Sequence, residues 1–401
     1  MRVVLITNYA PDRQESMLRF SAVLAAELPK HGFEIEVLAP RAIVGGRGSL
    51  HSGTGKWLAY VDKYLLFPRT LARRVRRAGP DTLFHICDHS NAVYTRIVER
   101  RPHLLTCNDL LAIRAARGEF PAIHIGRSGR VLQSAILRGI RRASFATCIS
   151  AATRRDVLRL AELPPERVTV THMGFNHPYR RMELSAARAS VAAMLPEAMR
   201  DGVRSGATRF VFHVGGNQWY KNRLGVLALY EALHVGAPPG RAVPVLLLAG
   251  QKWSAEVAAR VASNARLRDA VFALEDVGNA QLEALYSAAE CLFFPSLAEG
   301  FGWPIVEAQA CGCRVVSTQD VPMTEVGGTG PLYLELDEVR AENAEGVQRG
   351  ARKIAALLAE GEAEAASRIA AGHANIAHFT TDGMIAKYVD LYREILSAPR
   401  S

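Results

Sequence analysis

The chain has 401 residues, of which 49% are hydrophobic and 22% are charged. A chain of this length is too long for a single hydrophobic core, so two domains are expected. The composition excludes a disordered or fibrous protein. No apolar run approaches the roughly 18 residues of a membrane-spanning helix, and the N-terminus enters a strand pattern at Arg2 without the features of a secretory signal. Six cysteines scattered through apolar segments predict buried thiols rather than a disulfide scaffold, and hence a cytoplasmic location.

The net charge of +10 is unevenly distributed. Residues 1–180 contain 28 Lys and Arg against 14 Asp and Glu, whereas residues 181–401 contain 21 against 25. A basic half suits a phosphorylated substrate, an anionic membrane surface or nucleic acid, although arginine-rich helices with solvated faces would give the same counts. The two halves are therefore expected to have different partners.

Strand and helix patterns alternate along the whole chain. The first half carries a helix pattern at 16–28, a glycine-rich loop or hairpin at 42–56, and strand patterns at 2–7, 34–38, 82–87, 104–107, 145–149 and 168–173. After a polar stretch the pattern restarts, with strands at 209–214, 243–249, 271–274, 291–295 and 314–317 and helices between them. Strands rich in Val, Ile, Leu and Phe joined by helices predict an α/β protein with two doubly wound, Rossmann-like domains, divided near residue 180.

Several familiar motifs are absent. The sequence has no Gly-x-Gly-x-x-Gly after its first strand, no His-Glu-x-x-His and no Gly-x-Ser-x-Gly. It also lacks Asp-x-Asp, which argues against a transferase that holds its nucleotide sugar through a metal, and the pair Cys311 and Cys313 is too closely spaced for zinc. We therefore expect neither a metal site nor a cofactor.

The most informative stretch is 293–312, where a buried strand ends at Pro295, a glycine-containing loop follows, and Pro304 opens a helix. This loop falls at the carboxyl edge of a parallel sheet, where such folds bind ligands, and the free amides of the helix start suit a phosphate. Glu299 and Glu307 flank the helix start, and they suit sugar hydroxyls better than a phosphate. Either glutamate alone would be explained by the helix dipole, but the combination favours a nucleotide-sugar site.

This stretch resembles the Glu-x7-Glu signature of the retaining glycosyltransferases of family 4, which have the GT-B fold with the active site in the interdomain cleft. The resemblance extends over most of the chain. It includes the strand and Lys-Asn loop at 212–223, the segment 276–285, the Pro-x-x-Glu-Val turn at 322–326 and the C-terminal segment 379–396. It implies an acceptor-binding domain over 1–180, a nucleotide-sugar-binding domain over 181–384, and a C-terminal helix at 385–401 that packs back on the first domain.

The resemblance also assigns roles to single residues. Glu307 would hold the ribose hydroxyls, Glu299 the transferred sugar, and Lys221 the diphosphate. The remaining donor-binding positions would be the backbone of Gly215, Gly216, Asn217, Phe301 and Gly302. In the first half, Thr106-Cys107-Asn108-Asp109 falls where the family often has Thr-x-His-Asp, so Asn108 and Asp109 are candidate catalytic positions beside Glu299.

Three features depart from the family pattern. The loop before Lys221 lacks the usual arginine, the glycine pair after the first strand is missing, and the active-site histidine is replaced by Asn108. His89, which follows the strand at 82–87, is another polar candidate for the catalytic site, although an ordinary turn residue would serve there as well. Because an amide cannot exchange a proton or carry a positive charge near pH 7, catalysis is expected to be altered, lost or suppressed.

These observations predict a metal-independent retaining glycosyltransferase that moves a sugar from a UDP-sugar or GDP-sugar to a sugar or lipid-linked acceptor, in surface polysaccharide or glycolipid assembly. One alternative is a nucleotide-sugar-binding protein with weak or no turnover, because of Asn108. The other is a nucleic-acid-binding protein, but this sequence has no recognised pattern of interleaved basic and aromatic residues. The segment 56–77 joins aromatics and leucines to an arginine cluster. It suits peripheral contact with the inner face of an anionic membrane, or equally an ordinary helix with its arginines in water.

Overall fold

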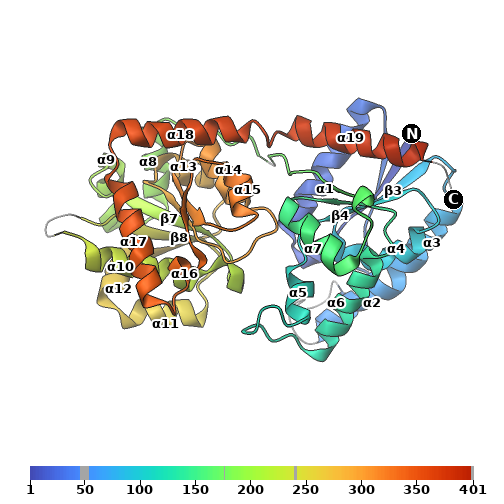
Figure 1. Ribbon diagram of the computed structural model, residues 1–401, viewed down its shortest axis with the longest axis horizontal. Coiled ribbons are helices and arrows are strands. Elements are labelled where there is room, and N and C mark those ends of the chain that lie inside the picture. Colours follow the sequence, from blue (N-terminus) through green and yellow to red (C-terminus); the bar gives the residue numbers. More distant parts are fainter. Residues whose placement is uncertain (46–53, 176, 239–241, 399–401) are drawn as a thin grey trace. The chain divides into compact units, whose positions relative to one another are not determined.

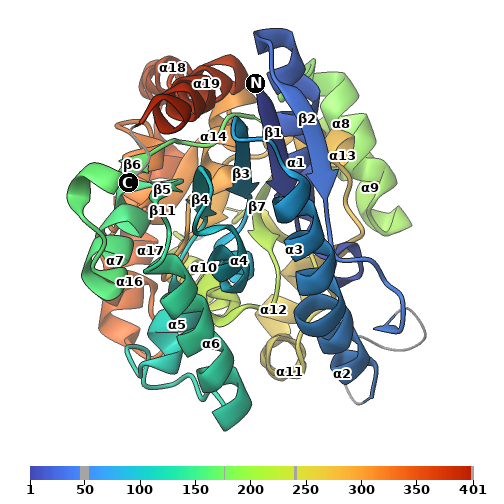
Figure 2. The same ribbon diagram turned by 90° about the vertical axis from the view of Figure 1, so that its right-hand side faces the viewer.

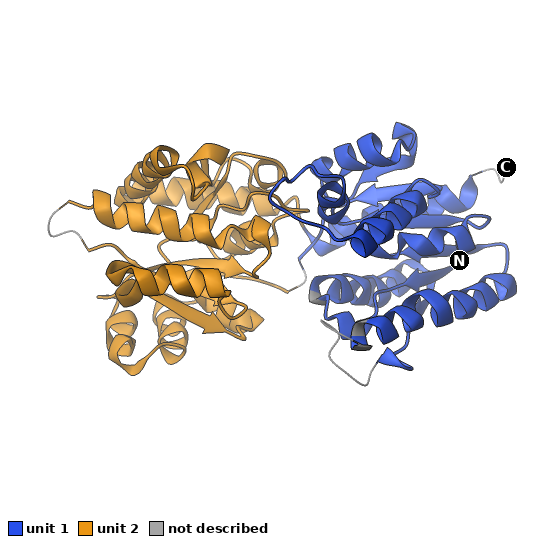
Figure 3. Cartoon of the chain, turned by 90° about the horizontal axis from the view of Figure 1, so that it is seen from below, with its two compact units in different colours: residues 1–176, 380–401 blue, residues 177–379 orange. Residues whose placement is uncertain are grey.

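The computed structural model describes residues 1–45, 54–175, 177–238 and 242–398. It divides into two compact units, shown in different colours in Figure 3. Unit 1 comprises residues 1–176 and 380–401, and unit 2 comprises residues 177–379. The chain thus leaves unit 1 once and returns to it with its last helix.

Unit 1 is built on a six-stranded parallel sheet in the order β2-β1-β3-β4-β5-β6. Every residue of β3 and β4 is buried, as the continuous apolar runs of these strands predict for a sheet covered on both faces. The strands are β1 Arg2–Ile6, β2 Glu34–Leu38, β3 Thr82–Ile86, β4 His103–Cys107, β5 Phe145–Cys148 and β6 Val168–Val170.

Helices cover both faces of this sheet, and Figures 1 and 2 show them from two directions. They are α1 Glu15–Glu27, α2 Thr54–Val61, α3 Phe67–Arg77, α4 Thr95–Val98, α5 Leu111–Ala116, α6 Arg127–Ile140, α7 Ala151–Ala161 and α19 Thr381–Ser397. Helices α3, α4, α6 and α7 pack on the face that carries Phe84 and Ile86. Because successive strand residues point to opposite faces, His85 lies on the other side, against α1 and α19.

The C-terminal helix α19 is fixed to unit 1 by buried polar contacts. The Tyr392 hydroxyl lies 2.6 Å from Nδ1 of His85, whose Nε2 lies 2.7 Å from the Thr106 hydroxyl. The Tyr388 hydroxyl lies 3.1 Å from the same threonine oxygen. Burial lowers the pKa of His85 to about 3, so this imidazole is neutral and serves packing.

Unit 2 repeats the design with a parallel sheet in the order β12-β11-β10-β7-β8-β9. Its strands are β7 Phe210–Gly215, β8 Val245–Gly250, β9 Val271–Glu275, β10 Leu292–Phe294, β11 Val315–Thr318 and β12 Leu332–Leu334. Its helices are α8 Leu184–Ala193, α9 Glu197–Ser205, α10 Arg223–Gly236, α11 Ala255–Ser263, α12 Ala265–Ala270, α13 Asn279–Ala288, α14 Trp303–Ala310, α15 Met323–Gly327, α16 Leu336–Val339, α17 Ala344–Ala359 and α18 Glu362–Ile376. Two doubly wound α/β units are therefore confirmed.

The expected strands agree with the observed ones to within a few residues. The short edge strand β12 was not predicted, because three residues are too few for a periodic signal. Of the glycine-rich stretch at 42–56, residues 46–53 lie outside the described residues, and the chain is already helical from Thr54. All six cysteines are buried and free. Among the described residues no helix is long and apolar enough to cross a membrane.

Candidate functional site

The candidate donor-binding loops of unit 2 lie at the carboxyl ends of two neighbouring strands, β7 and β10. The loop after β7 leads through Lys221 into α10, and the loop after β10 leads through Glu299 into α14. The two loops are joined by a hydrogen bond from the Leu297 amide to the Tyr220 carbonyl, 2.8 Å long. A parallel α/β sheet binds ligands at this edge, so the sheet order itself brings these loops together.

Lys221 and Glu299 form a close ion pair. The Lys221 ammonium lies 2.7 Å from Oε1 and 3.0 Å from Oε2 of Glu299. The side chains are 17% and 8% exposed, so water screens this pair weakly. The ammonium also lies over the Phe294 ring, 5.2 Å from its centre. A cation held beside a carboxylate in this way can bind an anionic group of a ligand while the carboxylate accepts its hydroxyls.

Glu307 lies in α14 and is 7% exposed. Its Oε2 accepts a 2.9 Å hydrogen bond from the hydroxyl of Tyr286 on α13. Burial, together with the adjacent Glu307 carboxylate, holds the pKa of Tyr286 well above its usual range, so the phenol remains a donor. Tyr286 thus fixes the orientation of this carboxylate, a role that the sequence alone did not suggest.

The start of α14 depends on a glycine. Gly302 precedes the helix with φ +104, a left-handed conformation that L-residues with a Cβ adopt only under strain. Phe301 beside it is 2% exposed and packs edge-on against Trp303 and Phe379. The backbone predicted to contact the donor therefore rests on a buried aromatic anchor.

The glycine loop after β7 is organised by a residue that sequence reasoning missed. Arg223, which is 5% exposed, donates to the Gly215 carbonyl at 2.6 Å and to Oδ1 of Asn217 at 2.8 Å. Gly250 is the last residue of β8 and has φ +124, and a Cβ there would lie 2.4 Å from the Gly215 oxygen. A buried arginine two residues after the lysine would have been a usable signal for this role.

Asn217 and Gly216 are in contact with neighbouring residues of the same unit. The Asn217 amide nitrogen in the side chain donates to the Lys252 carbonyl at 2.8 Å, and its backbone amide donates to Oε1 of Gln251 at 2.9 Å. A Cβ on Gly216 would meet the side-chain oxygens of Gln218 and Gln251 at 2.4 and 2.9 Å. In this conformation both residues shape the loop, and contact with a donor stays a prediction.

Among the described residues, the strand ends beneath these loops carry two buried polar atoms without a hydrogen-bond partner. They are Nε2 of His213, on β7, and the hydroxyl of Ser296, directly after β10. Burial lowers the pKa of His213 to about 3, so its ring is neutral, and its Nδ1 lies 2.9 Å from the Phe293 carbonyl. Unsatisfied polar atoms are rare in protein interiors, and a bound ligand is one of the groups that can satisfy them.

In unit 1 the candidate residues surround the carboxylate of Asp88, which is 3% exposed and follows β3. Oδ1 of Asp88 accepts from the side-chain amide of Asn108 at 3.0 Å, and Oδ2 accepts from that of Asn8 at 2.6 Å. Nδ1 of His89 lies 3.1 Å from Asp88. Burial opposes charge on the ring, but Asp88 outweighs it and raises the pKa of His89 to about 9. The imidazolium in turn holds the pKa of Asp88 below its usual range against the effect of burial.

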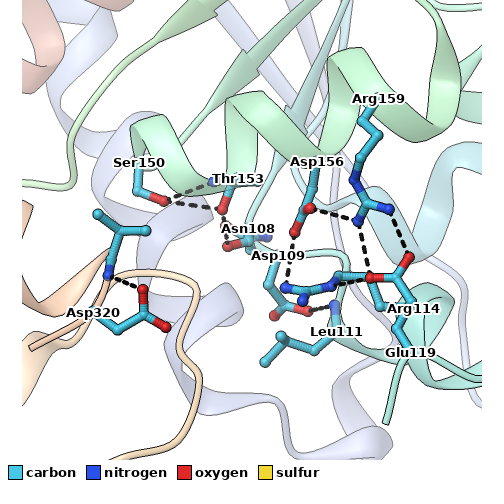
Figure 4. Close-up of polar contacts among 11 residues, drawn as sticks. Asn108, Asp109, Leu111, Arg114, Glu119, Ser150, Thr153, Asp156, Arg159 and Asp320 are labelled. Carbon is cyan, nitrogen blue, oxygen red and sulfur yellow. Dashed lines mark hydrogen bonds and ion pairs between the residues drawn. The ribbon is translucent and has the colours of Figure 1, made fainter. Parts of the chain in front are cut away.

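Asn108 is 4% exposed, and its Oδ1 has no hydrogen-bond partner among the described residues. Its backbone oxygen accepts from the hydroxyl of Thr153, which also contacts Ser150 (Figure 4). Asp109 faces its own turn and accepts from the Leu111 amide at 2.9 Å. The structure therefore brings Asn108 and His89 together around Asp88, while the Asp109 carboxylate caps the start of α5.

Two family models match consecutive parts of the chain. Residues 19–177 match the family described as Glycosyltransferase Family 4, and residues 197–330 match the one described as Glycosyl transferases group 1. Each match lies within one of the two doubly wound halves. The second includes the Lys221, Glu299 and Glu307 region.

Curated proteins and solved structures give the same picture. The O-antigen chain mannosyltransferase B of Escherichia coli is 25% identical over 224 residues, and the match spans only 56% of each chain. The alpha-maltose-1-phosphate synthase of Mycobacterium tuberculosis is 29% identical over 325 residues, with 77% of this chain and 78% of the synthase covered. The crystal structure of HepE from Anabaena, solved with UDP and glucose, aligns with a TM-score of 0.69 and 15% identity over 98% of this chain and all of that one.

Proposed function

We propose that this chain is a retaining glycosyltransferase of family 4, with the Glu-x7-Glu signature of that family. It would move a sugar from a nucleotide diphosphate sugar to an acceptor with retention at the anomeric carbon. The GT-B fold and the two glycosyltransferase family models that match its halves support this proposal. The observation that carries the proposal is the Lys221–Glu299 pair in the loops after β7 and β10. Glu307 lies in α14, the helix that follows the second of these loops. The complex of HepE with UDP and glucose supports a UDP-sugar, with a GDP-sugar as the alternative.

The donor would be held by chemistry that this site already presents. Glu307, oriented by Tyr286, accepts hydrogen bonds from the two ribose hydroxyls. Glu299 accepts from hydroxyls of the transferred sugar, and Lys221 supplies positive charge to the diphosphate. The amides at the start of α14 add donors at the positive end of a helix dipole.

The reaction breaks the bond between the anomeric carbon and the diphosphate oxygen and forms a bond from the same carbon to an acceptor oxygen. In front-face attack the acceptor proton passes to the leaving phosphate oxygen, so no separate protein base is required. Negative charge grows on the diphosphate, where Lys221 and the helix amides stabilise it. Since the sequence has no Asp-x-Asp and Lys221 supplies the counter-charge, we infer that no metal takes part.

The acceptor is proposed to bind unit 1, with Asn108 and the Asp88–His89 pair at its site. The names of the relatives, an O-antigen mannosyltransferase and a maltose-1-phosphate synthase, support a surface polysaccharide or glycolipid as the product class. The basic unit 1 supports a reaction in the cytoplasm at the inner face of the cell membrane.

Calorimetry on two glutamate variants tests the donor site. A thermal-shift panel of UDP, GDP, ADP and dTDP first identifies the nucleotide, because a ligand of the folded state raises its melting temperature. Glu307→Gln should then weaken binding of that bare diphosphate by tenfold or more, since charge-assisted hydrogen bonds contribute roughly 1.5–3 kcal/mol. Glu299→Gln should leave diphosphate binding intact and slow turnover of the intact donor.

Glu283→Gln is the matched control. Glu283 lies on α13 in the same unit and is 13% exposed, but it pairs with His177 rather than with the candidate site. This variant should bind the diphosphate like the parent. If Glu307→Gln and Glu299→Gln both bind every nucleotide and donor as the parent does, the donor site is misplaced.

A second candidate function, a nucleotide-sugar-binding protein with little turnover, is favoured by one observation. The side chain of Asn108 is held by Asp88 at the position where the family resemblance would place a histidine, and an amide neither takes up nor releases a proton near pH 7. The two candidates differ in whether the donor is consumed when an acceptor is supplied.

A further inference from the structure

A groove of about 660 Å³ opens on unit 1, and Asp88, His89 and Asn108 are not among the residues that line it. Helices α2 and α6 line it from two sides, and both extend toward the lower edge of the unit in Figure 2. Its floor includes Tyr94, whose hydroxyl donates to the Lys63 carbonyl at 2.8 Å, and Gly139. A Cβ on Gly139 would lie 2.0 Å from the Ala92 oxygen, so the approach of α6 to this floor requires glycine. The volume is that of a site for a small organic ligand.

One wall of the groove is a row of aromatic rings. Trp57, Tyr60 and Tyr64 follow one another at the spacing of one helix face. The ring centres are 5.7 Å apart for the first pair and 5.4 Å for the second, and both pairs are edge-on. The Lys63 ammonium lies 5.3 Å from the centre of the Tyr60 ring and forms an ion pair with Asp12 at 2.7 Å. These two contacts hold the aromatic row in place.

The opposite wall is aliphatic, with Val131, Leu132 and Ala135 of α6. Val131 is 66% exposed and Trp57 is 64% exposed, so the groove leaves large apolar side chains in contact with water. Together with the aromatic row they form one contiguous apolar surface, which is typical of a binding groove.

Arginines line the groove beside these walls. Arg142 pairs with Glu99 at 3.0 Å, but Arg96 and Arg138 are exposed and have no hydrogen-bond or ion-pair partner among the described residues. Two unpaired guanidinium groups beside an apolar channel are complementary to a molecule with an anionic head and a hydrocarbon tail. Guanidinium groups bind phosphate oxygens in bidentate fashion, which favours a phosphate head.

We propose that this groove binds the lipid part of a membrane-borne acceptor, with the hydrocarbon chain between α2 and α6 and its phosphate against Arg96 and Arg138. This proposal extends the proposed function and rests on it in one respect, because the bound lipid is an acceptor only if the protein is a transferase. The lipid-binding site itself is inferred from the groove alone. The aromatic row can also lie at the membrane interface, where Trp and Tyr rings are favoured.

The test uses the full-length chain without any nucleotide sugar and alkyl phosphates below their micelle concentrations. Binding of octyl, decyl and dodecyl phosphate is followed by tryptophan emission, with Trp57→Phe identifying the signal of the groove. Affinity should rise about fourfold for each added methylene, the fold-change that corresponds to burying one CH₂. Inorganic phosphate and dodecanol should each bind far more weakly than dodecyl phosphate.

Two pairs of variants locate the site. Val131→Asp should weaken dodecyl phosphate binding tenfold or more, whereas Val235→Asp, at an equally exposed valine of unit 2, should not. The double variant Arg96→Gln with Arg138→Gln should weaken binding to a similar extent. Its control, Arg155→Gln with Arg352→Gln, removes two exposed arginines that also lack partners among the described residues and should bind like the parent.

Nucleotide binding by each variant separates this proposal from the previous one. All variants should bind the preferred nucleotide like the parent, and the thermal unfolding of the unit 1 variants should match that of the parent, which shows that unit 1 is folded. An affinity that does not change with chain length would overturn the lipid site even if the transferase proposal holds. The same conclusion would follow if Val131→Asp and the double arginine variant bound dodecyl phosphate as strongly as the parent does. A parent that binds dodecyl phosphate as expected but no nucleotide would leave the lipid site standing and remove the donor site.

Discussion

At the scale of single residues, the orientation of the Asn108 amide decides what this position can do. Its NH₂ group donates a hydrogen bond to Asp88, so the buried Oδ1 is an acceptor without a partner among the described residues. An acceptor oxygen can receive a hydrogen bond from a sugar hydroxyl, but it supplies neither a proton nor a positive charge. The neighbouring His89 is paired with Asp88, and it is therefore the charged group of the cluster.

Restoring histidine at this position should raise turnover. For Asn108→His we expect a gain of about tenfold or more with the same donor and acceptor, about 1.4 kcal/mol of barrier, and an unchanged affinity for the nucleotide. The measurement is steady-state turnover of the variant beside the parent. An unchanged or lower rate with the donor still bound would show that this position does not carry the chemistry here.

The Asp88–His89 pair predicts a pH dependence of stability. The pKa of His89 is raised to about 9, against an ordinary value near 6.5 in the unfolded chain. The pair therefore stabilises the fold fully below about pH 6.5 and loses this effect as the pH rises through 9. Over that window the parent should lose up to about 3 kcal/mol more than His89→Gln does. Thermal unfolding of both proteins between pH 6 and 10 measures it, and parallel curves would contradict the charged pair.

At the scale of elements, the loops after β7 and β8 touch through glycine. The left-handed conformation of Gly250 and its close approach to the Gly215 oxygen leave no room for a methyl group. The position of the loop that presents Lys221 therefore depends partly on β8, a strand from a different part of the chain.

Gly250→Ala should disturb both stability and donor binding. We expect a loss of at least about 1–3 kcal/mol of unfolding free energy from backbone strain, and a weaker affinity for the nucleotide because the loop shifts. Gly236→Ala is the control, since nothing lies within 4 Å of a Cβ at that position and its φ is not positive. It should be neutral or slightly stabilising. Denaturant unfolding and calorimetry compare the two, and equal behaviour would contradict the close-packed loop.

At the scale of the whole molecule, the last helix completes the unit that contains the first strand. Helix α19 buries Met384, Tyr388 and Tyr392 within unit 1, against Phe20 and His85. Unit 2 ends at Phe379 and has its own core. The two units are therefore expected to respond differently to loss of the C-terminus.

Removing residues 380–401 should damage unit 1 and spare unit 2. The deletion exposes apolar surface and the buried partners of two tyrosines, so unit 1 should unfold at lower temperature or lose its cooperative transition. Nucleotide binding should persist, because the proposed donor residues lie in unit 2. Calorimetry and limited proteolysis check this, with Tyr392→Phe as a milder variant that removes only the contact to His85. Loss of nucleotide binding together with unit 1 would contradict the independence of the donor site.

The sequence alone predicted the two parallel α/β halves and the strand–loop–helix at 293–312, because hydrophobic periodicity, Pro304 and the glycines are local signals. It also singled out Lys221, Glu299 and Glu307 as candidates. The tertiary structure decided that Lys221 pairs with Glu299, that Tyr286 orients Glu307 and that Arg223 holds the glycine loop. It also showed that Asp88 gathers Asn108 and His89. Local patterns cannot give these contacts, because they depend on which strands become neighbours. In unit 2 that order places β7 beside β10, two strands about eighty residues apart in the chain, and depends on long-range packing of the whole sheet.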